Sequence, residues 1–110
     1  MKKDTHQQEL DRVQTLYREW TKLLPELEAD IYRWQKAIDL IQQIEDFYTN
    51  GHYRTLYEAQ EKGIQLNTHT EGEYSILSED AIWNALHDFR QLTLQRLKSA
   101  VSALEHEYNS

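Results

Sequence analysis

The sequence predicts an all-α protein, an antiparallel helical bundle built from a long N-terminal helix, a short middle helix and a long C-terminal helix. Two stripes of apolar residues, spaced three and four apart, run through most of the chain. The 110 residues include 3 Gly and 1 Pro, so turn-forming residues are scarce. A chain of this length without a boundary in composition is expected to form a single helical domain over residues 1–110.

The N-terminal helix is predicted from a heptad pattern that starts at Leu10, and such a pattern is typical of a coiled coil. Further apolar residues widen the stripe, which favours a bundle over a simple two-stranded pairing. The stripe contains Leu10, Val13, Tyr17, Trp20, Leu24, Leu27, Ile31, Trp34, Ile38 and Ile41, and it is widened by Leu16, Leu23, Ala37 and Ile44.

Pro25 interrupts this stripe without shifting its phase. A proline in a helix interior removes a backbone hydrogen bond and costs about 3 kcal/mol, so the helix is expected to kink or to break there. The unchanged phase favours one kinked helix. A break, with Pro25 at the first position of a second helix, is the alternative.

The first helix is expected to end at Asn50-Gly51, because glycine after a helix end adopts the left-handed conformation without strain. A short helix should follow over HYRTLYEAQEKG, with a Glu58 to Lys62 pair, and end at Gly63. Residues 64–77 lose the helical periodicity but contain too many apolar residues for a solvated linker, so we expect this loop to pack against the helices; the apolar residues are Ile64, Leu66, Tyr74, Ile76 and Leu77.

The C-terminal helix is predicted to begin within SILSEDAIWNALHDFR. Ser78 is expected to be its N-cap, and the Glu79 and Asp80 carboxylates complement the positive end of the helix dipole. Leu77 and Ile82 occupy the two positions of a hydrophobic staple. The apolar face of this predicted core helix contains Ile82, Leu86, Phe89, Leu97, Ala100 and Leu104, widened by Trp83, Leu94, Val101 and Tyr108.

The same stretch carries a polar cluster of Asp80, Asn84, His87 and Asp88 at helical spacing. A metal-dependent or hydrolytic enzyme that uses Asp80, His87 and Asp88 is therefore the alternative function. The Glu-x-x-His and His-Glu-x-x-His patterns, a nucleophile motif and a glycine-rich phosphate loop are all missing from the sequence. The solvated face of a helix is the favoured explanation of the cluster.

A second group, His69, Glu71 and Glu73, lies in the loop and would have to order that loop before it could bind a metal. The chain has no Cys, which excludes thiol chemistry and cysteine metal sites. We therefore expect no catalytic residue, no metal site and no cofactor.

Four tyrosines, Tyr48, Tyr53, Tyr57 and Tyr74, surround the middle segment. We expect them to cover the end of the bundle. An interaction patch is the alternative, because tyrosine is enriched at protein interfaces.

The formal net charge of −7 argues against nucleic-acid binding, which requires clustered basic residues. A basic protein is the kind of partner that such a surface attracts. The mean hydropathy is −0.84, and no apolar run approaches the ~20 residues of a membrane-spanning helix. Polar residues from Asp4 to Glu9 replace the apolar run of a signal peptide, so we expect a cytoplasmic protein outside the membrane.

Two motifs carry a resemblance: FYTNGHY, with Phe47, Tyr48, Gly51 and Tyr53, and LSED at residues 77–80. From about residue 10 to residue 97 the chain resembles a family of short bacterial proteins, the domain of unknown function forty-two ninety-eight. The family tends to have basic residues and Gly before LSED, where this chain has EYSI. The resemblance implies a helical bacterial protein and no reaction, which favours a non-enzymatic protein–protein interaction or adaptor module.

A homodimer formed by the first helix is expected from the lengths of the helices. At a rise of ~1.5 Å per residue, the first helix spans roughly 70 Å and the last roughly 45 Å. The overhang would expose more apolar surface than monomers tolerate, and a twofold partner would bury it in a four-helix bundle. If the chain breaks at Pro25, a monomeric three-helix bundle is the alternative.

We predict that Ser78→Ala lowers the free energy of unfolding by about 1 kcal/mol through loss of the cap, whereas His87→Ala lowers it by less than about 0.5 kcal/mol. Chemical denaturation of both variants measures the order. A larger loss in His87→Ala would contradict the helix-start interpretation and favour a site at the polar cluster.

Overall fold

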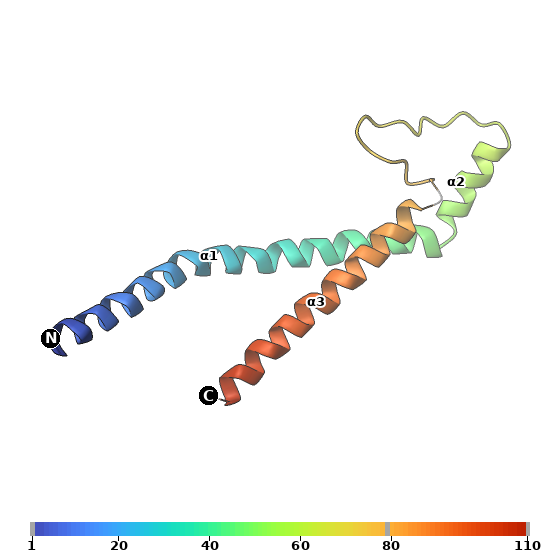
Figure 1. Cartoon of the computed structure of the whole chain (residues 1–110). Helices are drawn as coiled ribbons and strands as arrows, with labels where there is room; N and C mark the ends of the chain where they lie inside the picture. The colour runs from blue at the N-terminus through green and yellow to red at the C-terminus, as the bar shows by residue number, and fades with distance from the viewer. Residues whose placement is uncertain (1, 79, 110) are drawn as a thin grey trace. The chain divides into compact units, whose positions relative to one another are not determined.

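The computed structural model describes residues 2–78 and 80–109, and the side chains of residues 4–78 and 80–107. Three helices account for most of these residues: α1 (Lys2–Thr49), α2 (His52–Glu61) and α3 (Ala81–Asn109) (Figure 1). The predicted all-α class is confirmed. The chain divides into two compact units, Met1–Ile38 and Asp39–Ser110, and α1 contributes to both. The antiparallel bundle stays a prediction.

α1 continues through Pro25, so the predicted alternative of a break at this residue is wrong. Pro25 has no N–H to donate to the carbonyl group of Thr21, one turn earlier. Both residues are exposed, so water can bond to that carbonyl oxygen, and the helix loses a single internal hydrogen bond. The kink stays a prediction.

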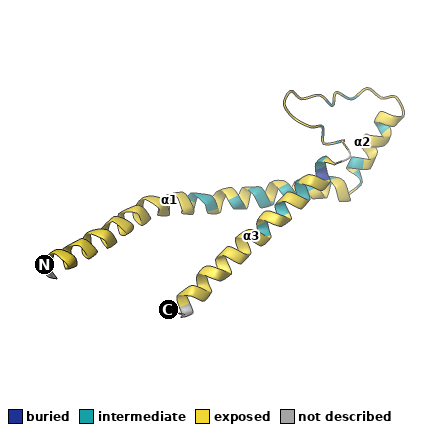
Figure 2. Ribbon diagram, in the orientation of Figure 1, coloured by how far each residue is buried: buried dark blue, intermediate teal, exposed yellow. Residues whose placement is uncertain are grey.

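The described residues of the first unit, 2–38, are all helical, and the described side chains, those of residues 4–38, are in contact with solvent. Every side chain from Asp4 to Glu28 is exposed, which Figure 2 shows as a continuous exposed stretch of α1. Local pairs occur on this surface, such as the salt bridge of 2.7 Å from Arg12 Nη2 to Glu9 Oε1. The hydrogen bond and the positive charge of Arg12 lower the pKa of the Glu9 carboxyl group.

The predicted turn after α1 is confirmed at Gly51, whose φ of 94° is left-handed. The Gly51 carbonyl oxygen accepts hydrogen bonds from the backbone N–H and the hydroxyl group of Thr55, both at 3.0 Å. The Asn50 side chain accepts a bond from the His52 N–H at 3.0 Å. α2 therefore starts immediately after α1 ends, with two residues between them.

α2 ends as predicted, with a left-handed glycine at Gly63 (φ 91°). The Gly63 N–H donates to the Gln60 carbonyl and the Ile64 N–H to the Ala59 carbonyl, each at 3.1 Å. These two bonds are those of a Schellman motif, which satisfies the last carbonyl groups of a helix. The predicted partner of Glu58 is wrong, because Arg54, one turn earlier, lies 3.7 Å from its carboxylate in place of Lys62.

The core of the second unit is small. Ile82, with 5% of its surface exposed, is the one buried hydrophobic residue among those that the structure describes. Half-buried apolar side chains from α1, α2, the loop and α3 belong to the same unit: Ile41, Ile44, Phe47, Tyr53, Leu77, Leu86 and Phe89. On α3, the residues of this core lie in the first half of the helix.

The prediction of a core helix is wrong for the second half of α3. Its apolar side chains are 39–58% exposed at Leu94, Leu97, Val101 and Leu104, and the Tyr108 side chain lies outside the described residues. The part of α1 in this unit, residues 39–49, has a length of roughly 16 Å, whereas α3 has a length of roughly 44 Å. Within the second unit, the apolar face of α3 is therefore longer than the part of α1 that belongs to the same unit.

α3 begins at Ala81, two residues later than predicted, so Ser78 lies three residues before the first helical residue and does not occupy the predicted N-cap position. The backbone carbonyl of Ser78 accepts a bond from the Ala81 N–H at 3.3 Å, so a turn precedes the helix. The Ser75 hydroxyl accepts a bond from the Leu77 N–H at 3.1 Å and shapes the approach to that turn. Glu79, predicted to lie in the first helical turn, is outside the described residues.

The loop between α2 and α3 packs only in part, which corrects the expectation of a packed segment. Leu66 and Leu77 are half-buried, whereas Ile64, Tyr74 and Ile76 are exposed. A tight turn at residues 70–73, with Gly72 at φ 79° and a 3.0 Å bond from the Glu73 N–H to the Thr70 carbonyl, satisfies local backbone groups. Local turns of this kind need no packed surface.

Over the residues that the structure describes, none of the helices has the length and apolar composition that a membrane-spanning segment requires.

We predict that Pro25→Ala raises the free energy of unfolding by about 1–3 kcal/mol, because alanine restores the hydrogen bond to the Thr21 carbonyl group. Thermal unfolding followed by circular dichroism measures the gain. Glu26→Ala, at the neighbouring exposed position, is the control and should change stability by less than about 0.5 kcal/mol. Equal stabilities of the two variants would contradict a continuous helix that is weakened at Pro25.

Candidate functional site

Three of the four predicted tyrosines form a row where α1 meets α2. The Tyr53 ring lies 5.4 Å from the Tyr48 ring and is stacked on the Tyr57 ring at 6.2 Å, measured between centroids. Phe47 adds an edge-to-face contact with Tyr53 at 6.1 Å. These distances are typical of favourable aromatic pairs. Tyr74 is 93% exposed, and no ring contact joins it to the row within the described part of the chain.

Tyr53 also connects α2 to Leu77, in the loop segment that precedes α3. Its hydroxyl group donates a hydrogen bond of 3.3 Å to the backbone carbonyl of Leu77, 24 residues later. The bond is partly buried, so it holds the end of the loop against the tyrosine row. A local helix start and a tyrosine row, predicted separately from the sequence, therefore belong to one structural feature.

A cavity of about 510 Å³ lies at this junction, and all of its lining residues belong to the second unit. Its volume falls within the ~300–1,000 Å³ of ordinary ligand sites. Aromatic, aliphatic, hydroxyl and carboxylate groups meet in it. We refer to it as the aromatic pocket, and it is lined by Tyr48, Tyr53, Ser78, Asp80, Ile82, Trp83 and Leu86.

The predicted staple and cap residues belong to this region. Ser78 and Ile82 line the aromatic pocket, and Leu77 is half-buried and accepts the bond from Tyr53. Trp83, predicted to lie in the core, is instead 64% exposed and contributes to the pocket. The aromatic pocket is therefore built from residues that the sequence assigns to a helix start and to a core.

A second cavity, of about 550 Å³, shares Tyr48 and Tyr53 with the aromatic pocket. Thr49, Gly51, Arg54 and Tyr57 complete its lining. Arg54 is the charged group in this lining, and Glu58 lies 3.7 Å from it. The two cavities therefore differ in the sign of the charge that they present, acidic in one and basic in the other.

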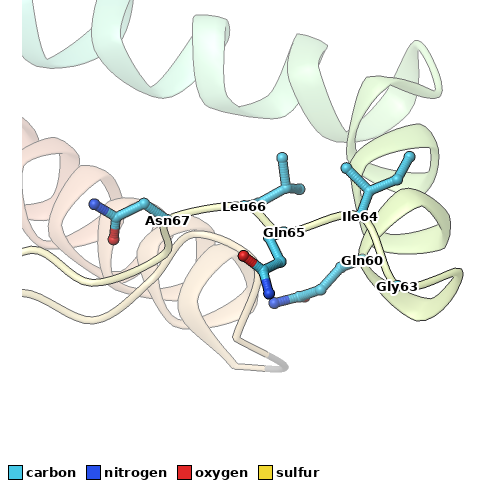
Figure 3. A pocket seen from close by; sticks show the side chains of 6 residues that line it. All are labelled: Gln60, Gly63, Ile64, Gln65, Leu66 and Asn67. Carbon is cyan, nitrogen blue, oxygen red and sulfur yellow. The ribbon is translucent and has the colours of Figure 1, made fainter.

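A third cavity, of about 600 Å³, lies after α2 (Figure 3). The amide ends of Gln60 and Gln65 lie close together, and the Ile64 and Leu66 side chains point away from them (Figure 3). Among its described lining residues there is no charged or nucleophilic group. This cavity offers amide and aliphatic contacts without a feature that selects one ligand class.

The polar cluster of the alternative enzyme hypothesis lies along α3. The His87 ring is stacked on the Trp83 ring, with centroids 5.1 Å apart and planes at 4°. Asp80 lies at the aromatic pocket, while Asp88 is exposed. Over residues 2–78 and 80–109, no group of three or more His, Asp or Glu residues is arranged to hold a metal ion, at this cluster or at His69, Glu71 and Glu73.

Residues 10–99 match a family whose description is Domain of unknown function (DUF4298). The chain belongs to this family. The match spans the tyrosine row, the loop and the aromatic pocket, so the DUF4298 domain includes the whole candidate site. No curated protein and no solved structure matches the chain.

Sequence reasoning did not identify Phe47 and Trp83 as parts of the site. Phe47 stands in the FYTNGHY motif directly beside Tyr48, and this position next to a helix end was the available signal. Trp83 follows Ile82 in the helix, so its direction differs by about 100° from that of the buried residue. That rotation was sufficient to indicate an exposed position.

We predict that Tyr53→Phe lowers the free energy of unfolding by about 0.5–1.5 kcal/mol, because it removes the hydrogen bond to the Leu77 carbonyl and keeps the ring. Denaturant titration measures the loss. Tyr57→Phe is the matched control, because no hydrogen bond of its hydroxyl group occurs in the described part of the chain. If both variants lose the same free energy of unfolding, the 3.3 Å hydrogen bond does not contribute to stability.

Proposed function

We propose that this DUF4298 protein is a non-enzymatic protein–protein interaction module, and that it forms a homodimer through the apolar stripe of α1. The observation that carries the proposal is the exposure of that stripe. The large apolar side chains from Leu10 to Ile31 are 38–66% exposed: Leu10, Val13, Leu16, Tyr17, Trp20, Leu23, Leu24, Leu27 and Ile31.

An isolated amphipathic helix gains little stability in water from its own backbone, because most helical stability in proteins comes from packing of the apolar face. Monomeric proteins rarely expose a contiguous apolar patch larger than a few hundred Å². The stripe on α1 therefore favours a partner that covers it. The heptad spacing of Val13, Tyr17, Trp20 and Leu24 suits another helix with the same spacing.

A second copy of the chain supplies such a helix. A twofold arrangement places the same stripe on both sides of the interface, and this is the commonest symmetry of small oligomers. The charges support it, since residues 1–38 contain seven acidic and seven basic residues, and two such helices do not repel each other through net charge. The exposed apolar face of α3 offers further surface for a four-helix bundle.

The proposed setting is the cytoplasm of a bacterium. The resemblance to short bacterial proteins, carried by the FYTNGHY and LSED motifs, and the polar, acidic composition support this setting. We further propose an adaptor function, in which the dimer joins other proteins. The acidic charge of the second unit favours this function.

Light scattering at micromolar concentration tests the dimer. We expect a mass of about twice the 13.2 kDa of one chain, and a doubly substituted Trp20→Glu, Leu27→Glu chain should have a mass near 13.2 kDa because it places charges within the stripe. Thr15→Glu adds one such charge on the opposite face of the heptad and should keep the doubled mass. Circular dichroism of each variant establishes that the helices are formed.

A wild-type mass near 13.2 kDa would contradict the homodimer. A doubled mass that survives the double substitution would show that the interface lies away from the stripe of α1.

A further inference from the structure

We propose that the aromatic pocket binds an arginine side chain presented by a basic segment of a partner protein. The inference rests on the proposed role as an interaction module and gives that role a site and a ligand chemistry. The pocket combines three aromatic rings with one carboxylate, which is the combination that recognises an organic cation.

The rings supply the first part of the recognition. Tyr48, at the end of α1, and Trp83, in the first turn of α3, are far apart in the sequence. Both side chains are exposed, and both line this cavity. Tyr53, held by Tyr57 and by the Leu77 carbonyl, lines it as well. His87 is stacked on one face of the Trp83 ring and Tyr57 on one face of the Tyr53 ring, so a ligand would use the other faces and the Tyr48 ring. A guanidinium group is planar and weakly hydrated, so it stacks on an aromatic face at a smaller desolvation cost than an ammonium group.

Asp80 determines the sign of the ligand charge. It is the charged residue among the described lining residues, and its carboxylate is exposed, so an incoming cation can reach it. The start of α3 opposes this preference with roughly half a positive charge. A full negative charge on Asp80 exceeds that contribution, and an anion would meet repulsion from it.

The sequence segment that contains the pocket residues has the same sign. Residues 39–88 contain ten acidic and two basic residues, whereas residues 1–38 are balanced. One of the two basic residues, Arg54, is paired with Glu58. The acidic character of the chain is therefore concentrated around the segment that forms the pocket, and it complements a segment of protein rich in Arg and Lys.

Arginine fits the pocket better than lysine for a geometric reason. Its guanidinium group can stack on an aromatic face and direct two N–H groups at one carboxylate at the same time. A lysine ammonium group carries the same charge as a compact point and gains less from the rings. The aliphatic Ile82 and Leu86 side chains give the arginine stem apolar surface to cover.

Nuclear magnetic resonance titration tests the inference, with the Trp83 indole N–H as the reporter. The probes are an eight-residue peptide with one Arg and two flanking Lys, the same peptide with citrulline in place of Arg, and the same peptide with Lys in place of Arg. We expect a saturable shift with the Arg peptide, weaker binding of the Lys peptide by about twofold to fivefold, and a still weaker effect of the citrulline peptide, which keeps the two flanking Lys charges but lacks the guanidinium charge.

Two substitutions assign the binding to the pocket. Asp80→Asn keeps a side chain that can accept hydrogen bonds at the helix start and should weaken binding of the Arg peptide by about threefold to tenfold. Asp88→Asn, an exposed acid two turns later on α3 and outside the lining, is the matched control and should leave the affinity within a factor of about two. Trp83→Leu, followed by the shifts of neighbouring amide groups, should weaken binding by about twofold to fivefold.

Equal affinities of the Arg and citrulline peptides, or equal effects of Asp80→Asn and Asp88→Asn, would overturn the proposal. Capped arginine amide is the small-molecule arm, and tighter binding of this compound than of the peptide would overturn the assignment to a protein segment. Light scattering of the same samples separates the two proposals. If the sample is dimeric and the Arg peptide does not bind, the pocket proposal is contradicted and the homodimer proposal is not.

Discussion

The second unit depends on the position of Tyr53. One side chain contacts the end of α1 through Phe47 and Tyr48, its own helix through Tyr57 and the start of α3 through the Leu77 carbonyl. A unit with one buried hydrophobic residue among those described has little other packing to fix the three segments. The ring contributes apolar area, and its hydroxyl group satisfies a backbone oxygen that the loop leaves available.

The local features of the fold could be predicted from the sequence, because each follows from residues close in the chain. The glycines at 51 and 63 ended helices as expected, and both have a positive φ. The heptad phase across Pro25 correctly indicated a continuous helix, since the phase of a stripe is preserved only when the chain keeps its helical turn. The start of α3 was predicted two residues early, and a hydrogen bond from the Ala81 N–H to the Ser78 carbonyl closes a turn immediately before the helix.

The candidate site was harder to predict because it depends on contacts between distant residues. Tyr48, Tyr53 and Tyr57 were grouped correctly by their sequence positions, but Tyr74, placed with them on the same basis, is exposed and apart from the row. An apolar pattern also does not show how much of an apolar stripe is buried. The same spacing that is half-buried at Ile41 and Ile44 is exposed at Leu16 and Leu23.

The exposure of the first unit has a consequence for its dynamics. The side-chain hydrogen bonds described for residues 4–38 join residues three or four apart, as in Arg12 with Glu9 and Thr15 with Asp11. The backbone N–H groups of a helix likewise bond four residues back, so they can open without disturbing the rest of the chain, and amide protons there are expected to exchange through small openings rather than through global unfolding. If a second copy covers the stripe, the protection of these amides becomes a function of protein concentration, and the first half of α1 behaves as a segment whose order is set by assembly.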